Sequence, residues 1–436
     1  MKKLYYTRRQ VCQIGLSGLT SLALLDLVGC GGATSSGSGS ETLQLSFWGD
    51  ASRNKLTRNA ITLFQQAHPN ITIHSWFANF NDYFNKLNTQ IAGGTTPDLI
   101  QMDMAYVAQY VNEHILLDLS DLISNKTIDL SDFDQGQIAS SEDNGKLYGI
   151  SLGGNYESMF YDTQFVQQAG VGNPPATWTW DDFATYTGKI SKALASQKIF
   201  GTGDYSGAID VFEIWVRQQG HELYTPDGKV GFTAQDATSW FNYWSELRKA
   251  GACASAEIQA SVTGSGPSST LLVQGKAAFA IAHSNQYHGF QTLSQHKYAF
   301  QMVPNGPQPG LYEKPSMLMS IAARSKYADD AARFINFIIT DPKGVKAIGL
   351  DRGIPGSARA RATLEASATP EDKAVLDFAN QVASSGLTRP KKILDPPAAG
   401  KLQTALQDVA QAVSFGKQTP AEGGNALYQQ ALKFLV

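Results

Sequence analysis

The sequence predicts an α/β fold, with helices on the faces of a largely parallel sheet, and three observations carry this prediction. Strand-like and helix-like segments alternate from residue 43 onward. Gly and Pro residues separate the segments at short intervals, as they do between the elements of such folds. With 42% hydrophobic residues, the 436-residue chain can bury a large core, which suggests one bilobal unit or two to three domains.

The first part of the body has the order strand, helix, strand, helix, strand. The first strand alternates apolar and polar residues and runs into Gly49 and Asp50, as a strand entering a loop does. The first helix has apolar residues at helical spacing and is stopped by Pro69. Successive units of this kind give parallel strands. The five elements are a strand over 43–48, a helix over 55–68, a strand over 71–77, a helix over 82–92 and a strand over 97–102.

The same alternation continues along the rest of the chain. Thr179, followed three residues later by Asp182, is typical of a helix start, because each side chain caps the backbone of the other. Asp341-Pro342 is typical of a helix end. The later elements are helices over 179–195, 237–250, 329–340 and 398–415 and a strand over 276–282.

The first thirty residues have the three parts of an export signal, namely basic residues, an apolar run and small residues before a cleavage site. Arg8-Arg9 looks like a twin-arginine export motif, although arginine pairs also occur in ordinary signals. Leu27-Val28-Gly29-Cys30 resembles the bacterial lipobox, in which the cysteine is acylated and becomes the mature N-terminus. We therefore expect a signal peptide over 1–30, lipidation at Cys30 and a flexible linker over 31–42.

Composition and motifs exclude several classes of function. The net charge of −3 and the lack of basic blocks predict no nucleic-acid partner. Only Cys253 of the three cysteines lies in the body, which excludes a disulfide framework and predicts a buried apolar side chain there. GxSxG, HExxH, P-loop and strand-linked GxGxxG motifs are absent, and the acid pairs at 181–182 and 329–330 lie at helix starts. We therefore expect no catalytic residue, metal or cofactor.

A set of short motifs in a fixed order carries a resemblance to a known family. The longest is the run from Tyr83 to Asp103, which contains Ala-Gly-Gly-Thr-Thr-Pro-Asp-Leu-Ile at 92–100. The other motifs are Phe47-Trp48-Gly49-Asp50 with Arg53, Leu116-Leu117-Asp118-Leu119, Gly145-Lys146-Leu147-Tyr148-Gly149-Ile150, Phe160-Tyr161-Asp162, the stretch 174–183, Gly275-Lys276-Ala277-Ala278 and Arg352-Gly353-Ile354-Pro355. With these motifs, nearly the whole mature chain resembles the extracellular solute-binding lipoproteins of ABC importers, in the carbohydrate class related to maltose-binding protein.

The resemblance implies a periplasmic-binding-protein-like fold of type II, with two discontinuous α/β lobes around a hinge and a ligand cleft. It places lobe 1 at 43–150 plus 304–345 and lobe 2 at 151–303 plus 346–436. The implied function is that of the substrate-binding component of an ABC sugar importer. Such a component binds a carbohydrate, here expected to be an oligosaccharide, and delivers it to the transmembrane permease subunits, which couple it indirectly to the ATPase. The implied protein is an exported, non-enzymatic monomer, anchored by its lipid to the outer face of the cytoplasmic membrane, at the cell surface or in the periplasm.

Candidate ligand contacts should follow the strands or lie at the crossings between lobes, because ligands of α/β folds bind beyond the carboxyl ends of the strands. A sugar needs aromatic platforms and planar polar groups. We expect Trp48 as a platform, Asp50 as a hydroxyl acceptor and Arg53 as a donor, with a core tryptophan and a helix-capping aspartate as the alternative. The full set is Trp48, Asp50, Arg53, Phe80, Asn81, Asp103, Tyr106, Asn155, Tyr156, Glu157, Trp215, Asn285, Tyr287, Ser316 and Arg352.

The resemblance itself suggests three of these candidates. Asn155 matches a position where relatives place a polar ligand-binding residue, although the residue varies among them. Asn285 and Tyr287 match positions where maltose-binding relatives stack aromatics, so the ligand is expected to differ from maltose in that pose. Core packing is the alternative for Trp215, and a structural role is expected for the remaining body tryptophans, Trp178, Trp180, Trp240 and Trp244.

Two other classes of function stay open at this point. A receptor for a peptide, a polyamine or iron would need acidic or metal-ligating clusters, and the aromatic-rich, weakly charged loops argue against these. The charged fraction of 17%, together with 7 Trp and 17 Tyr residues, favours a neutral ligand. A surface lipoprotein glycosidase would need two opposed carboxylates. The sequence marks no such pair.

Overall fold

The structure is a computed structural model that describes residues 41–139, 142–143, 145–262, 266–389 and 395–435. The predicted signal peptide, Cys30 and the linker up to residue 40 lie outside the described residues. The described residues belong to one compact unit. Among them, no helix combines the length and the apolar character needed to cross a membrane.

The first sheet confirms the predicted opening of the body. Its strand order is β2-β1-β3-β13-β6. β1 pairs in parallel with β2 and β3, while β13 runs antiparallel to both β3 and β6. The bounds are β1 (Glu41–Trp48), β2 (Ile71–Ala78), β3 (Leu99–Met102), β6 (Ile150–Ser151) and β13 (Leu318–Ile321). β1 takes in the last two residues of the predicted linker.

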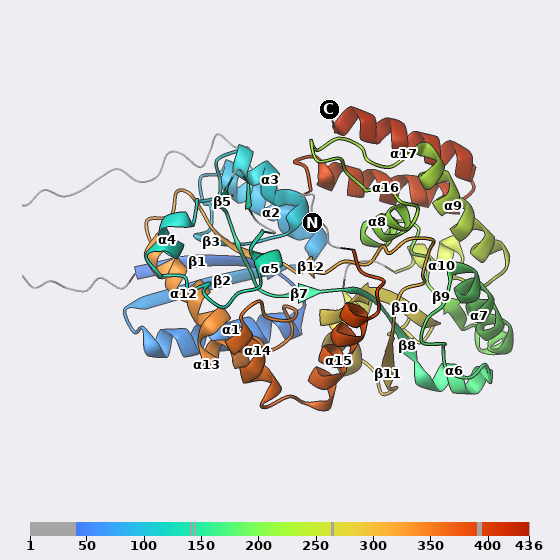
Figure 1. The fold of residues 1–436 in the computed structure, drawn as a ribbon, viewed down its shortest axis with the longest axis horizontal. Coiled ribbons are helices and arrows are strands. Elements are labelled where there is room, and N and C mark those ends of the chain that lie inside the picture. The colour runs from blue at the N-terminus through green and yellow to red at the C-terminus, as the bar shows by residue number, and fades with distance from the viewer. Residues whose placement is uncertain (1–40, 140–141, 144, 263–265, 390–394, 436) are drawn as a thin grey trace, which may run out of the picture. The chain divides into compact units, whose positions relative to one another are not determined.

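Helices cover both faces of this sheet, with α2 and α3 on one side and α1, α12 and α13 on the other (Figure 1). Their bounds are α1 (Ala51–Ala67), α2 (Phe80–Ala92), α3 (Met104–Asn112), α12 (Ala328–Thr340) and α13 (Pro342–Ile348). α1 starts earlier than predicted because Asp50 caps it, and its apolar stripe is buried through Ala60 and Phe64. The core of this half also includes buried side chains from β1, β3 and β13.

The second sheet has the order β11-β8-β10-β9, with β8 (Glu157–Asp162), β9 (Phe200–Thr202), β10 (Ala277–His283) and β11 (Tyr298–Gln301). β8 runs antiparallel to both of its neighbours, and only β9 and β10 are parallel. The prediction of a parallel sheet therefore holds for β1, β2 and β3 but not for the second sheet. Periodicity can indicate a strand but not the direction in which it pairs, so the antiparallel pairing of β8 could not be predicted from it.

A cluster of aromatic side chains fills the space between the helices of the second half. Trp180 lies 5.5 Å from Trp215 and 6.1 Å from Trp240 between ring centroids, in edge-to-face geometry. Trp244 is fully buried, and Trp178 donates to the Met302 carbonyl at 2.9 Å. The structural role expected for these four tryptophans is confirmed, and buried Cys253 lies in the same core. The helices are α6 (Thr163–Ala169), α7 (Trp180–Ala193), α8 (Ile209–Gln218), α9 (Ala234–Lys249), α16 (Ala399–Ser414) and α17 (Pro420–Phe434).

The chain crosses between the two sheets at three places that lie side by side. It leaves the first sheet after β6 through β7 (Gly154–Asn155), and it returns from β11 through β12 (Lys314–Pro315). β7 and β12 pair with each other, and Ile354 exchanges two backbone hydrogen bonds of 2.8 Å with Gly154. α14 (Ala358–Glu365) then packs on α13, whereas α15 (Pro370–Ser384) packs on β11. The predicted lobe boundaries remain a prediction.

The remaining elements are short. They are α4 (Ser120–Ser124), α5 (Gln135–Ala139), β4 (Glu142–Asp143), β5 (Lys146–Leu147), α10 (Ala256–Ala260) and α11 (Tyr287–Thr292), with 3-10 helices at Ala195–Gln197, Pro267–Ser269 and Ser284–Gln286.

Candidate functional site

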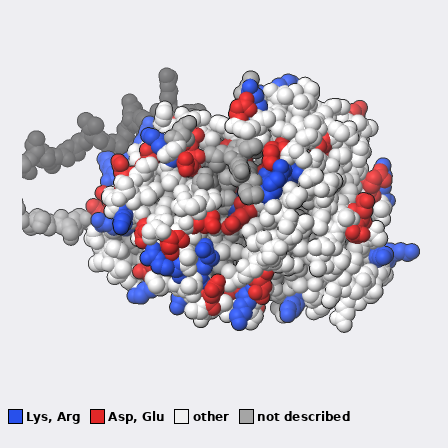
Figure 2. Space-filling model, in the orientation of Figure 1, with Lys and Arg blue, Asp and Glu red and all other residues white. Residues whose placement is uncertain are grey.

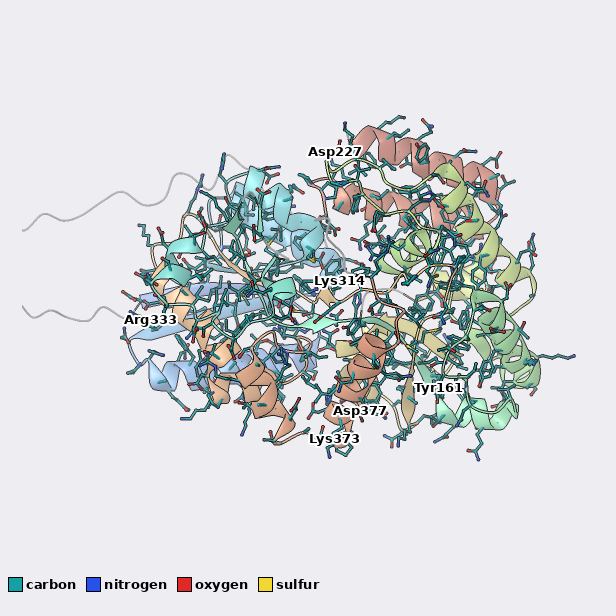
Figure 3. All side chains as sticks on the ribbon, in the orientation of Figure 1. Tyr161, Asp227, Lys314, Arg333, Lys373 and Asp377 are labelled. Carbon is teal, nitrogen blue, oxygen red and sulfur yellow. The ribbon has the colours of Figure 1, made fainter. Side chains whose placement is uncertain are left out.

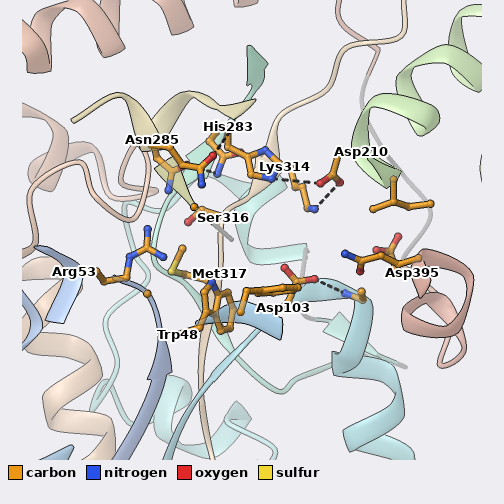
Figure 4. Close-up of a pocket in the computed structure, with 18 of the residues that line it drawn as sticks. Trp48, Arg53, Asp103, Asp210, His283, Asn285, Lys314, Ser316, Met317 and Asp395 are labelled. Atoms are coloured by element: carbon orange, nitrogen blue, oxygen red, sulfur yellow. Dashed lines mark hydrogen bonds and ion pairs between the residues drawn. The ribbon is translucent and has the colours of Figure 1, made fainter. Parts of the chain in front are cut away.

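A cavity of about 280 Å³ lies at the carboxyl ends of β1, β3 and β10, beside the paired crossing strands β7 and β12 (Figure 4). This is where an α/β fold is expected to hold a ligand. Side chains from both sheets and from all three crossings line it. The lining residues are Trp48, Gly49, Asp50, Arg53, Phe80, Asp103, Ala105, Asn155, Ile209, Asp210, Glu213, Leu223, Tyr224, Gly266, Pro267, His283, Asn285, Gln286, Gly289, Lys314, Ser316, Met317, Asp351, Asp395, Ala399 and Gln403.

The end of β1 supplies an aromatic and an ionic contribution to the cavity. Trp48 is 7% exposed and meets Phe80 edge-on at 5.4 Å, so it is both a core residue and part of the wall. Asp50 accepts from the Arg53 backbone at 2.9 Å and thereby caps α1. The Arg53 side chain donates from Nε to Asp351 at 2.8 Å, across 298 residues of sequence. Both alternatives for Trp48 and Asp50 therefore coexist, because each residue serves the fold and faces the cavity.

A chain of amide hydrogen bonds joins the crossing segments at the cavity wall. Asn155 Nδ2 donates to Asn285 Oδ1 at 3.3 Å, and Asn285 Nδ2 donates to the Asp351 carbonyl at 2.9 Å. Asn155 is 1% exposed, and its Oδ1 has no hydrogen-bond partner among the described residues. This oxygen is a buried acceptor, and a buried acceptor without a donor is costly. The arrangement leaves a buried acceptor without a donor behind the cavity wall.

An ionic network runs along the other side of the cavity. Lys314 Nζ lies 2.6 Å from Asp210 Oδ1, and His283 Nε2 lies 3.4 Å from the other oxygen of Asp210. His283 Nδ1 lies 2.7 Å from Glu157. Figure 3 shows Lys314 in the interior, between elements of the first and second sheets. Four ionisable side chains from β12, α8, β10 and β8 are thus connected.

The pKa values of these groups follow from their mutual contacts. Burial disfavours the charged form of His283, but the carboxylates of Glu157 and Asp210 outweigh it and raise the pKa of His283 to about 10. Burial also disfavours the charged form of Asp210. The positive charges of Lys314 and His283 nevertheless hold the pKa of Asp210 well below its usual range. The pKa of Lys314 is raised in turn, chiefly by Asp210 against the cost of its burial. His283, Asp210 and Lys314 are therefore all charged at neutral pH.

This network corrects one sequence-based expectation and bears on metal binding. The loops were expected to be weakly charged, but charged side chains form much of the cavity wall. Ligand atoms of Glu157, Asp210 and His283 lie within 4.8 Å of one another, which is close enough for a metal ion. However, both ring nitrogens of His283 face carboxylates and Lys314 engages Asp210, as expected for an ion-pair network.

Asp103 stands at the N-terminus of α3, directly after β3. Its Oδ1 accepts from the Ala105 backbone at 3.0 Å, which caps the helix. Burial raises the pKa of Asp103, and the charges of Asp210 and Asp395 raise it further, while Lys314 lowers it. Figure 4 shows the side chains of Asp103, Asp210 and Asp395 around Lys314, each from a different element.

Seven predicted contacts lie outside the cavity lining, and tertiary packing accounts for four of them. Trp215 packs within the tryptophan cluster. Tyr106 stacks on Phe84, with 3.8 Å between the ring centroids. Its ring also packs closely on Gly400, since a Cβ at Gly400 would come within 2.9 Å of the ring. The Tyr287 hydroxyl donates to the Tyr298 carbonyl at 3.0 Å. Buried Tyr156 donates its backbone N–H to Ser284.

The other three also have assignable places. Asn81 is exposed in the first turn of α2. Glu157 lies behind His283 and acts on the cavity through that side chain. Arg352 is 1% exposed and donates to Asp351 at 2.6 Å and to Thr57 at 2.9 Å, so it supports Asp351 from the core.

Several cavity residues were not predicted. His283 follows the predicted strand 276–282 directly, and Lys314 lies two residues before the predicted Ser316, so the position of each was a usable signal. Asp210 in α8 and Asp395 before α16 carry no such signal, because neither follows a strand. The Lys314–Asp210 ion pair could not be predicted because the two residues are 104 positions apart in the sequence.

The comparisons of the sequence and of the structure with known proteins indicate the same family. Residues 59–376 match the profile of the family described as bacterial extracellular solute-binding protein. A solved family 1 extracellular solute-binding protein from Alicyclobacillus acidocaldarius is 33% identical, covers 90% of this chain and 98% of its own, and superposes with a TM-score of 0.65. A periplasmic oligogalacturonide-binding protein from Yersinia enterocolitica shares the fold with a TM-score of 0.80, at 22% identity, over 90% of this chain and 98% of its own. The two-lobed fold is thereby confirmed.

Curated relatives match over shorter stretches. The arabinooligosaccharide-binding protein of Bacillus subtilis is 28% identical over 49% of this chain and 48% of its own length. Putative binding proteins of Brucella abortus are 24% identical over 63% of this chain. The chain spans 66% of the length of those proteins.

Proposed function

Because the chain belongs to the bacterial extracellular solute-binding proteins, we propose that it is the substrate-binding component of an ABC importer and binds a saccharide in the cavity at β1, β3 and β10. The single observation that carries the proposal is the composition of the cavity wall. Trp48 and Phe80 offer apolar surface, while Asp103, Asn155 and the Asp210 network offer charged and planar polar groups. Sugars present flat C–H faces and hydroxyl rims, which need this combination.

The proposed mechanism uses the two-sided construction of the cavity. Trp48 and Asp103 come from the first sheet, whereas Asp210 and His283 come from the second sheet and its helices. A ligand that contacts both sides stabilises the arrangement in which they lie close together. The three crossing segments are the places at which the two sides would rotate. The loaded form would then dock on the permease subunits and release the sugar, without chemical change to it.

Relatives support a saccharide rather than another solute. One relative is described as binding arabinooligosaccharides, and one neighbour of the same fold was solved with saturated digalacturonic acid. The volume of about 280 Å³ is near the lower end of the range for small-molecule sites. We therefore propose that one or two sugar units are enclosed and that the rest of an oligosaccharide would extend outward.

One feature favours a second candidate. Carboxylates outnumber basic side chains along the wall, and this would also suit a linear polyamine. A glycosidase is the remaining alternative, since several carboxylates face one space. Calorimetric titration with a glycan panel and with spermidine, followed by chromatography of the sugar, separates the three. Saturable sugar binding without product supports the receptor, spermidine binding alone supports the second candidate, and turnover contradicts both.

Replacing Trp48 with Phe is expected to weaken saccharide binding about tenfold, because the smaller ring offers less stacking surface to the sugar. Titration calorimetry measures the effect. Trp178→Phe is the control, since Trp178 is also a buried tryptophan but does not line the cavity. An unchanged affinity in Trp48→Phe, or an equal loss in the control, would count against a platform at Trp48.

We also propose that acylated Cys30 anchors the exported chain and that the following residues form a passive tether. Cys30→Ala is expected to move the protein from the membrane fraction to the soluble fraction while leaving its affinity for ligand unchanged, because the residues that line the cavity run from Trp48 onward. Fractionation with fatty-acid labelling checks the first outcome, and titration checks the second. A variant that stays in the membrane fraction would show that another feature anchors the chain.

A further inference from the structure

Two helices from opposite halves of the molecule meet at one rim of the cavity. α3 directly follows β3 of the first sheet, whereas α16 packs against α9 and α17 in the core of the second half. α3 and α16 contact each other although most of the chain separates them in sequence (Figure 1). The crossing segments connect the two halves covalently, so this contact is an additional, non-covalent junction between them.

The junction forms a wall between the cavity and the surface. On its inner side, Ala105 of α3 and Ala399 of α16 line the cavity. On its outer side, the next residue of each helix, Tyr106 and Gly400, lines a separate groove of about 370 Å³. A sugar in the cavity is therefore shielded at this rim only while α3 and α16 stay together.

Tyr106 is the side chain that bridges the two halves. It is partly buried and packs against both the core of the first half and the core of the second half. Its ring stacks on Phe84, and buried Phe84 lies 6.0 Å from Trp48 between ring centroids. A row of aromatic rings thus runs from the cavity wall at Trp48 to the junction, and Phe84 limits the space into which Tyr106 can retreat.

The lack of a side chain at residue 400 allows Tyr106 to come this close to α16. A Cβ at Gly400 would lie 2.9 Å from Cε1, 3.1 Å from Cζ and 3.2 Å from the hydroxyl oxygen of Tyr106. The two carbon distances are well below the optimal separation of non-bonded carbon atoms. Gly400 lies within α16, where glycine is less favourable than alanine. Packing at the junction, and not helix formation, therefore accounts for glycine at this position.

From this geometry we propose that Tyr106 and Gly400 are positioning residues, which form a clasp across the cavity rim and set how tightly the sugar is held without contacting it. The inference rests on the proposed function and adds a control of affinity to it. The clasp forms only in the arrangement that brings the two halves together, and the sugar is contacted from both sides only in that arrangement. Weakening the clasp lowers the fraction of molecules that can enclose the sugar, and the apparent affinity falls with that fraction.

Gly400→Ala tests the clasp on the purified protein, and the probe is the sugar of the glycan panel that the wild type binds most tightly. The added Cβ is expected to raise Kd about tenfold in titration calorimetry. The loss should appear mainly as faster dissociation in stopped-flow tryptophan fluorescence. The free energy of unfolding of the ligand-free protein should not fall, because opening relieves the contact with Tyr106 and alanine favours the helix.

Gly188→Ala is the matched control. Gly188 lies within α7 and does not line the cavity, and its added Cβ would meet Ala252 at an ordinary 3.8 Å. This variant should therefore bind the same sugar with the Kd of the wild type.

Tyr106→Leu completes a double-mutant cycle. Leucine loses part of the contact between the halves, so this variant alone is expected to raise Kd about threefold. Leucine also lacks the Cε1, Cζ and hydroxyl atoms that lie nearest to Gly400. Adding Gly400→Ala to Tyr106→Leu is therefore expected to cause no further loss, whereas a general disturbance of α16 would weaken binding in both backgrounds.

These measurements distinguish a wrong clasp from a wrong receptor assignment. Wild-type affinity in Gly400→Ala or in Tyr106→Leu, or an equal loss in Gly188→Ala, would overturn the clasp and leave the saccharide receptor standing. An undiminished effect of Gly400→Ala beside Tyr106→Leu, or a lower free energy of unfolding in Gly400→Ala, would also overturn the clasp, because the effect would then belong to the folding of α16. A wild-type protein that binds no sugar of the panel would overturn both.

Discussion

Asp210→Asn is expected to lower the free energy of unfolding by about 3–5 kcal/mol, because it leaves Lys314 and His283 without their shared counter-charge. Lys314 is 15% exposed in its side chain, so water cannot fully replace the lost carboxylate. Urea unfolding followed by tryptophan fluorescence measures the change. Asp227→Asn is the matched control, since Asp227 and its partner Lys229 are both about 60% exposed and the expected change is below about 0.5 kcal/mol.

The difference in stability between wild type and Asp210→Asn is also expected to depend on pH, in a direction set by the pKa of Asp210. The pKa of Asp210 is lowered in the folded state, so its contribution is complete above the unfolded value of about 4 and is lost as the pH falls through the folded value. The difference in stability between wild type and Asp210→Asn should therefore be constant above about pH 5 and shrink on further acidification. A difference that grew toward acid pH would contradict the ion-pair account.

Arg217→Met is the second substitution with a large expected effect, again about 3–5 kcal/mol of lost stability. The Arg217 side chain is fully buried and donates to the Gly310 carbonyl at 3.0 Å, to Glu222 at 2.6 Å and to the Arg389 carbonyl. Methionine fills part of the volume but donates nothing, so the carbonyls are left without this donor. Thermal and urea unfolding should show the loss in both midpoint and free energy.

Arg333→Met is the control for this substitution. Arg333 makes one ion pair with Asp330 at 2.9 Å and is 53% exposed, and Figure 3 shows it at the edge of the molecule. Its replacement is expected to change stability by less than about 0.5 kcal/mol. If both variants lost the same stability, the buried hydrogen bonds of Arg217 would not be the cause.

Local signals in the sequence were sufficient for the six helices that were predicted and for the first three strands. Thr179 and Asp182 cap each other as their spacing predicted, and Pro69 follows α1 closely. The direction of the antiparallel strands could not be predicted because it depends on tertiary contacts. β13 is only four residues long, and its direction follows from the return of the chain through β12.

Figure 2 shows acidic and basic side chains interspersed on the visible face, which agrees with the near-balanced net charge.

Site residues could be predicted where they directly follow a strand. They could not be predicted where the direction of the side chain determines whether the residue lines the cavity. Trp48 and Asp103 were found because they end β1 and follow β3. Asn155 lines the cavity but the next residue, Tyr156, does not, because successive residues of an extended chain point to opposite sides. Resemblance to a family could place this segment at the site without fixing that alternation.

The cavity's electrostatic character could not be predicted for a different reason. Lys314 and Asp210 are 104 residues apart, and each is unremarkable in its own segment. The pairing of β7 with β12 places Lys314 opposite Asn155, and its Nζ contacts Asp210 at the start of α8. Composition, with 17% charged residues, suggested a neutral ligand, because composition averages over the whole chain. Charge in a site depends on which few side chains meet there.

A crystal structure of the protein grown with its tightest-binding saccharide tests the central claim most directly. The account predicts one intact sugar in the cavity, packed against Trp48, with hydrogen bonds to Asp103 and Asn155. A sugar bound elsewhere on the chain, or a cleaved sugar in the cavity, would contradict it.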